Sequence, residues 1–105
     1  IASCVYGKVI QIWRAQTKEL WCLCTGSTFE HINTLTWSPD GRMLASGDRI
    51  GMVQIWDSRT GDTLRMYNGH TNGILSVAWS PNGRYLASSG EDTTVRIWRD
   101  PSLFL

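Results

Sequence analysis

Short segments rich in apolar and β-branched residues run along the chain and are separated by residues that favour turns. Segments 33–37 and 75–79 both end in tryptophan, and each is followed by a serine-proline turn, SPDG at 38–41 and SPNG at 80–83. Proline presets φ, while aspartate, asparagine and glycine tolerate left-handed backbone geometry. We therefore predict a tight turn at each site, with a β-strand on either side of it.

Further strand-like segments follow each of these hairpins. The stretches MVQIW at 52–56 and TVRIW at 94–98 are rich in β-branched and aromatic residues, which favour strands. The turn at 60–62, Thr-Gly-Asp, then leads into a fourth strand. No segment shows a sustained helical period with caps, so we expect an all-β protein with almost no helix.

The pattern is repeated at a nearly constant spacing. Trp13, Trp56 and Trp98 are 43 and 42 residues apart, and Trp37 and Trp79 are 42 residues apart. A unit of roughly 40–45 residues with four short antiparallel strands is typical of one blade of a β-propeller. Repetition itself supplies the core, because each blade is a small sheet whose two faces are covered by its neighbours.

Several spaced motifs in the last unit occur in register: GH at 69–70, WSPNG at 79–83, LAS at 86–88 and DTTVRIW at 92–98. On these motifs the chain resembles the WD-repeat family of β-propellers. The resemblance implies four-stranded antiparallel blades, each fastened by a hydrogen-bond relay between side chains. Carried over by position, the structural relay of the last unit consists of His70, Ser88, Asp92 and Trp98.

The middle unit departs from the family pattern. It has GST at 26–28 in place of Gly-His and Ile50 in place of the turn aspartate, which leaves Ser46 and Trp56 of the relay. The first unit likewise lacks part of the relay pattern. We therefore expect the stability of these two blades to depend more on packing.

The repeat divides the chain into three parts of one propeller domain. Residues 1–25 form the end of one blade, residues 26–68 one complete blade and residues 69–105 most of a further blade. Counted in strands this gives three, four and three, or about two and a half blades, whereas closed propellers have roughly four to eight. We expect an incomplete arc of a larger ring. The remaining blades of the same propeller, or further copies of the chain, would cover its open apolar ends.

Charge and cysteine content narrow the class of partner. Ten basic and nine acidic residues give a net charge of +1, so we expect neither nucleic acid nor a membrane as partner. The three cysteines, Cys4, Cys22 and Cys24, are an odd number, and no Asn-x-Ser/Thr site occurs. This favours a reducing compartment, and we predict a cytoplasmic protein with free thiols and no metal or cofactor.

The implied relay contains serine, histidine and aspartate, which also form the triad of many hydrolases. Ser88, however, lies in the middle of a predicted strand, and the chain has no GxSxG nucleophile elbow. It also lacks GxxxxGK[ST], HExxH and GxGxxG motifs. We therefore predict that the chain is not an enzyme.

The resemblance implies a non-catalytic scaffold that binds protein or peptide partners on the face formed by the loops between units and between second and third strands. The partner-binding candidates on these loops are Arg49, Glu30, His31, Asn72 and Glu91. Arg49 is the strongest of them, because an exposed guanidinium can make bidentate and stacking contacts.

Two other function classes stay open at this stage. The chain could be a sensor or regulatory propeller domain fused to an upstream catalytic module such as an NTPase or kinase. It could also read nucleic acid or methylated peptides, which would need a basic face or an aromatic cage. A net charge of +1 does not supply the first, and Phe29 and Tyr67 do not obviously form the second.

Overall fold

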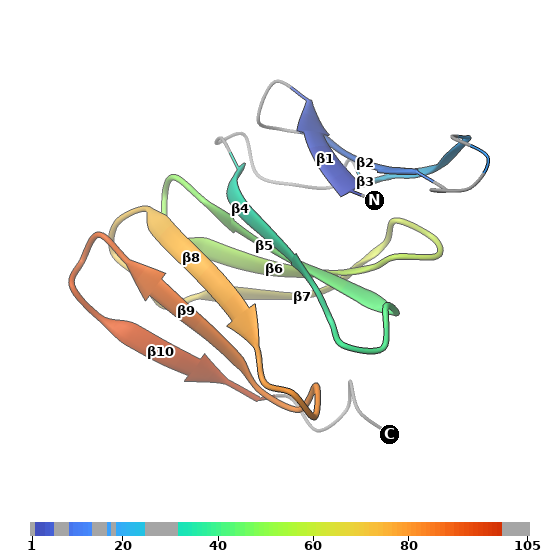
Figure 1. Cartoon of the computed structure of the whole chain (residues 1–105). Coiled ribbons are helices and arrows are strands. Elements are labelled where there is room, and N and C mark those ends of the chain that lie inside the picture. The colour runs from blue at the N-terminus through green and yellow to red at the C-terminus, as the bar shows by residue number, and fades with distance from the viewer. Residues whose placement is uncertain (1, 6–8, 14–16, 18, 25–31, 100–105) are drawn as a thin grey trace.

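The computed structural model describes residues 2–5, 9–13, 17, 19–24 and 32–99 (Figure 1). Within these ranges ten strands form three antiparallel sheets, and no helix occurs that could span a bilayer. The first sheet contains β1 (Ala2–Val5), β2 (Val9–Trp13) and β3 (Leu20–Cys24). The second contains β4 (Ile32–Trp37), β5 (Met43–Asp48), β6 (Met52–Asp57) and β7 (Thr63–Asn68). The third contains β8 (Ile74–Trp79), β9 (Leu86–Gly90) and β10 (Val95–Trp98).

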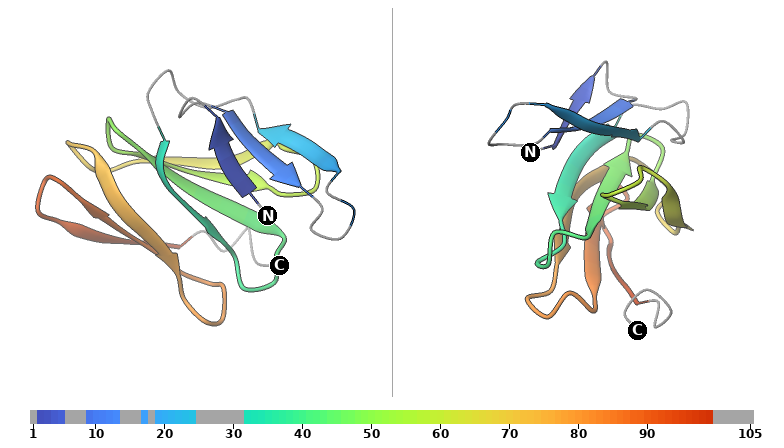
Figure 2. Two further views of the ribbon diagram at one scale, coloured as in Figure 1. Left: turned by 45° about the horizontal axis from the view of Figure 1, so that its top comes forward. Right: turned by 90° about the vertical axis from the view of Figure 1, so that its right-hand side faces the viewer.

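The three sheets follow one another as blades of an open arc (Figures 1 and 2). Each is a meander in which consecutive strands pair, and the sequence predicted this count of three, four and three strands. Strands β4 and β8 lie side by side, and two side chains link them. The Asn33 side-chain amide donates to the Ile74 carbonyl at 3.0 Å, and the Trp79 indole N–H donates to the Thr36 carbonyl at 3.4 Å.

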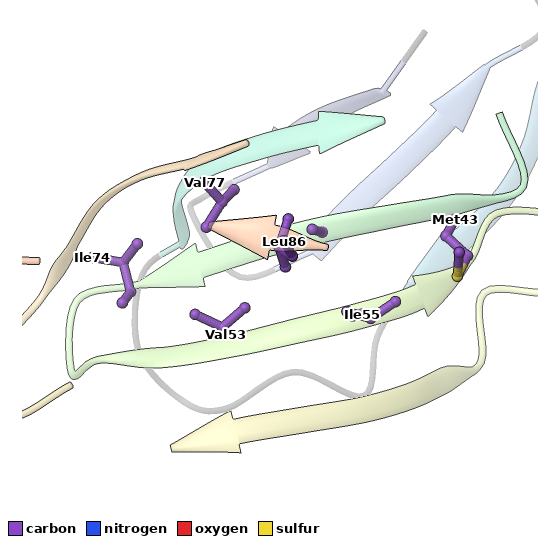
Figure 3. Packing of buried hydrophobic residues seen from close by; sticks show 7 residues of the cluster. Met43, Val53, Ile55, Ile74, Val77 and Leu86 are labelled. Atoms are coloured by element: carbon purple, nitrogen blue, oxygen red, sulfur yellow. The ribbon is translucent and has the colours of Figure 1, made fainter. Parts of the chain in front are cut away.

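The main core lies between the second and third sheets (Figure 3). Its buried members are Met43, Ala45, Val53, Ile55, Ile74, Val77 and Leu86. The four central residues of β6 are all buried, as expected for a strand with few charges that is covered on both faces. A second cluster joins Ile12 of the first sheet to Leu44 and Trp56 of the second. Packing between blades therefore supplies the core.

The second and third sheets lie close together at Gly47 of β5. A Cβ atom on this glycine would lie 2.3 Å from Cγ2 of Ile74 and 3.0 Å from Cγ2 of Thr34. Ile74 is completely buried. A side chain at position 47 therefore does not fit unless the two blades or Ile74 move.

The two serine-proline turns have the same internal hydrogen bonds. The Ser38 hydroxyl donates to the Asp40 carboxylate at 2.6 Å, and the Ser80 hydroxyl donates to the side-chain oxygen of Asn82 at 2.6 Å. The glycine that follows has a φ of 73° in both turns, a left-handed conformation that glycine adopts without steric cost. The arginine after each glycine is consequently held in an equivalent place on neighbouring blades.

The outer face of the third sheet is apolar and exposed. Leu75, Val95 and Ile97 are 59%, 69% and 63% exposed. These exposed fractions are high for large apolar side chains. This agrees with the expectation of an arc whose last blade presents an uncovered apolar face.

Candidate functional site

The structure brings His70, Ser88, Asp92 and Trp98 together in one hydrogen-bonded chain within the third sheet. The Trp98 indole N–H donates to the Ser88 hydroxyl oxygen at 2.7 Å, and that oxygen lies 2.7 Å from Nε2 of His70. Nδ1 of His70 is 3.1 Å from both carboxylate oxygens of Asp92. These hydrogen bonds connect strands β9 and β10 with the loop before β8 and with the turn between β9 and β10.

The directions of these hydrogen bonds follow from the two ends of the relay. The Asp92 carboxylate can only accept, so the neutral imidazole of His70 carries its proton on Nδ1, and its Nε2 accepts the Ser88 O–H. The Trp98 indole can only donate, so the Ser88 oxygen accepts from it. Among the described residues no buried side-chain nitrogen or oxygen lacks a partner. Ser88 is 1% exposed, so its hydroxyl is inaccessible to a substrate and acts as a structural link.

Asp92 is held as a carboxylate by three neighbours. The Thr94 hydroxyl donates to Oδ1 at 2.6 Å, the Thr71 backbone N–H donates to Oδ2 at 2.9 Å, and His70 approaches both oxygens. These hydrogen bonds, that of Thr94 first, lower the pKa of Asp92 far below its ordinary value of 3.8. The turn between β9 and β10 is thus closed around a negative charge.

This lowered pKa predicts an acid-dependent loss of stability. Since the unfolded chain binds a proton at Asp92 more readily than the folded chain, the contribution of Asp92 is complete above pH 3.8 and declines as the pH falls below it. The Asp92→Asn variant should be less stable at neutral pH and should lose less on acidification. Urea midpoints of both proteins across this pH range measure the difference. Parallel curves would contradict the role of the carboxylate.

The middle blade keeps part of the relay and adds a carboxylate that sequence reasoning missed. The Trp56 indole N–H donates to the Ser46 hydroxyl at 3.0 Å, as the remaining pattern implied. Oδ1 of Asp48 accepts the backbone N–H groups of Ile50 and Met52 at 3.1 and 2.9 Å. An aspartate that accepts an N–H two residues ahead is an Asx-turn, so the GD pair at 47–48 was a usable signal.

Asp48 corresponds to Gly90 in the third blade, 42 residues later. A Cβ atom on Gly90 would lie 2.6 Å from Nδ1 of His70 and 2.9 Å from Oδ1 of Asp92, so no side chain fits there. The amide of Thr94, which corresponds to that of Met52, is bound by Asp92 instead. The two blades therefore satisfy the same backbone amide with carboxylates from different positions.

An aromatic stack links the second blade to the relay. The rings of Tyr67 on β7 and Trp98 on β10 lie nearly parallel, with an interplanar angle of 14° and centroids 4.8 Å apart. Trp98 thus donates a hydrogen bond within its own blade through the indole N–H and stacks on a residue of the neighbouring blade through its ring face. On sequence alone Tyr67 was considered for an aromatic cage, and its stacking partner could not be read from the pattern.

Three of the five partner-binding candidates lie on one edge of the second and third sheets. Arg49, Asn72 and Glu91 are all exposed and stand on the β5–β6 turn, the β7–β8 loop and the β9–β10 turn, respectively, at the same end of the strands (Figure 1). Glu30 and His31 lie outside the described residues. Within the described ranges, no group of three or more potential metal ligands occurs.

Family models match nearly all of the chain. The model of the anaphase-promoting complex subunit 4 WD40 domain matches residues 1–77, and that of the WD domain, G-beta repeat, matches residues 61–99. The chain belongs to the WD-repeat family. This WD-repeat chain is 36% identical over 64 residues to cross-pathway control WD-repeat protein 2 of Flammulina velutipes. The match covers 61% of the chain and 20% of that protein, so the chain spans about a fifth of its relative.

A solved structure shares the fold. The crystal structure of the computationally designed Ika4 protein matches this WD-repeat chain with a TM-score of 0.81 at 22% identity, over 93% of the chain and 58% of Ika4. The structure is thus an open arc of a WD-repeat β-propeller. WD-repeat proteins are generally non-catalytic and typically act as modules for protein interaction.

Proposed function

We propose that this WD-repeat arc is a non-catalytic scaffold that binds a protein or peptide partner on the face formed by the turn at 48–51, the loop at 69–73 and the turn at 90–93. We call these segments the partner face. The observation that supports this most is the way their backbones are fixed to one another. Glu91 N–H donates to the Gly73 carbonyl at 2.8 Å, which joins two of the three.

The third segment of the partner face is fixed by close approach. A Cβ atom on Gly51 would lie 2.5 Å from the His70 carbonyl oxygen, and one on Gly73 would lie 2.9 Å from that of Arg49. The turns of two blades therefore interlock with no space for side chains between them. A platform that is rigid before binding loses little conformational entropy when a partner arrives.

The side chains on the partner face suit recognition of a polar protein surface. Arg49 and Glu91 carry opposite charges and Asn72 offers both a donor and an acceptor. Such a mixed set favours specificity through complementary charges more than it favours tight non-specific binding. The odd number of cysteines and the lack of Asn-x-Ser/Thr sites support a cytoplasmic setting for this interaction.

Selection of peptides from a random display library tests the proposal. We expect the selected peptides to shift backbone amide NMR signals at 48–51, 69–73 and 90–93. Arg49→Ala or Glu91→Ala should weaken their binding about tenfold, as expected for loss of one interfacial charged hydrogen bond. Arg99→Ala and Asp62→Ala, which remove exposed charges elsewhere, are the controls. Failure to select peptides, or signals that shift on other segments, would refute the proposal.

A further inference from the structure

A cleft opens at the opposite ends of the strands from the partner face. It has a volume of about 620 Å³ and is lined by the β4–β5, β6–β7 and β8–β9 turns with parts of the adjoining strands. Figure 1 shows these turns on the side away from the turns of the partner face. The cleft spans the second and third blades, so it exists only where two blades meet.

Three arginines line this cleft: Arg42, Arg59 and Arg84. Arg42 and Arg84 are exposed, and their guanidinium groups form no hydrogen bond or ion pair with another described residue. Arg59 approaches Asp57 at 3.7 Å, with a side chain that is 69% exposed, which is a weak pair. The cleft thus presents cationic groups whose hydrogen-bonding capacity is largely unused.

The two carboxylates in the lining are already engaged. Oδ1 of Asp40 accepts from the Ser38 hydroxyl at 2.6 Å and from the Arg42 backbone N–H at 3.0 Å. These two hydrogen bonds, that of Ser38 first, lower the pKa of Asp40. Oδ1 of Asp57 accepts the Arg59 backbone N–H at 2.8 Å. The two carboxylates are thus used within the turns, whereas the arginine side chains are exposed.

The remaining lining favours a peptide over a small molecule. Pockets for small molecules are mostly apolar and concave, whereas only four lining residues, Pro39, Met43, Leu64 and Pro81, are apolar here. A phosphate ion would fill a small part of a volume of this size. An extended segment with two acidic side chains could contact arginines on both blades and place its stem against the apolar residues.

We propose that this cleft binds an acidic segment of a partner protein, with Arg42 and Arg84 each holding a carboxylate of that segment. The equivalent turns supply the two guanidinium groups at repeated positions, and a guanidinium matches a carboxylate with two parallel hydrogen bonds. This surface is separate from the partner face, so the arc could hold two partners at once.

Binding of fluorescein-labelled hexaglutamate to the whole chain, followed by anisotropy, tests this inference. We expect binding that weakens with salt, because exposed charges are screened over about 10 Å at 0.1 M, and no binding of hexalysine. Amide NMR signals at 38–42 and 80–84 should shift. Arg42→Gln/Arg84→Gln should reduce affinity at least about tenfold, since two charged hydrogen-bond pairs are lost. The turns should persist, because they use the backbone amides of these arginines.

The control variant is Arg96→Gln/Arg99→Gln, which removes the same charge from exposed positions outside the cleft lining. It should retain the affinity of the unmodified chain. Equal losses in the two double variants would mean general attraction by net charge and would overturn the inference. Absence of hexaglutamate binding at low salt, or signals that shift only on the partner face, would overturn it as well.

Discussion

Ser88→Ala should lower the free energy of unfolding of the third blade by about 2–6 kcal/mol, since each of two buried polar groups left without a partner costs about 1–3 kcal/mol. The substitution removes a hydroxyl that is 1% exposed and leaves two groups unpaired, the indole N–H of Trp98 and Nε2 of His70. Native-state hydrogen exchange of the amides in β8, β9 and β10 measures the loss locally, without requiring a single cooperative transition.

The chain contains its own matched control for this prediction. Ser46→Ala removes the corresponding hydroxyl from the middle blade but leaves only the Trp56 indole unpaired, so its effect should be roughly half as large. Exchange should then accelerate in β4–β7 rather than in β8–β10. Equal effects of the two substitutions would show that the histidine contributes little to the relay.

Gly47→Ala should destabilise the contact between the second and third blades by about 3 kcal/mol, at the upper end of the range for overpacked cores. The added Cβ would lie 2.3 Å from Cγ2 of Ile74, a side chain that is completely buried. The two sheets must separate or Ile74 must leave its place in the core. Urea unfolding followed by tryptophan fluorescence, with exchange of the β4 and β8 amides, measures the loss.

Two further variants separate steric overlap from backbone strain. Gly41→Ala meets no atom within 4 Å but has a φ of +73°, so it should cost only about 1 kcal/mol through left-handed strain. Ile74→Ala removes the atom closest to the new methyl group, so its effect and that of Gly47→Ala should be less than additive. Full additivity would contradict a direct clash at this position.

The local chemistry of the chain was sufficient to predict the strands and the turns. Ser38 to Gly41 and Ser80 to Gly83 encode their hydrogen bonds within a few residues, so the pattern alone indicates the turn. The strands after these turns begin only at Met43 and Leu86, not directly after the glycine. The amides of Arg42 and Arg84, which lie between the glycine and the strand, donate to turn side chains instead of joining the sheet.

Features that depend on two blades could not be predicted in the same way. The stack of Tyr67 on Trp98 joins residues 31 positions apart in different sheets, and neither shows the other in its local sequence. The cleft containing Arg42 and Arg84 likewise requires the spacing of the blades. The relay residues came from resemblance to a family, whereas Asp48 was missed although its Asx-turn is encoded locally.

Gly90 occurs in the blade that has the histidine relay, whereas Asp48, at the equivalent position of the middle blade, forms an Asx-turn. This difference implies epistasis between positions of a repeat. A blade that carries Asp48 must lose this side chain before the relay can form, because the carboxylate stem would stand where the imidazole and its acid must meet. A relay blade cannot gain that aspartate without losing its histidine contact. Exchange of whole repeats, which moves both positions together, avoids the incompatible intermediates.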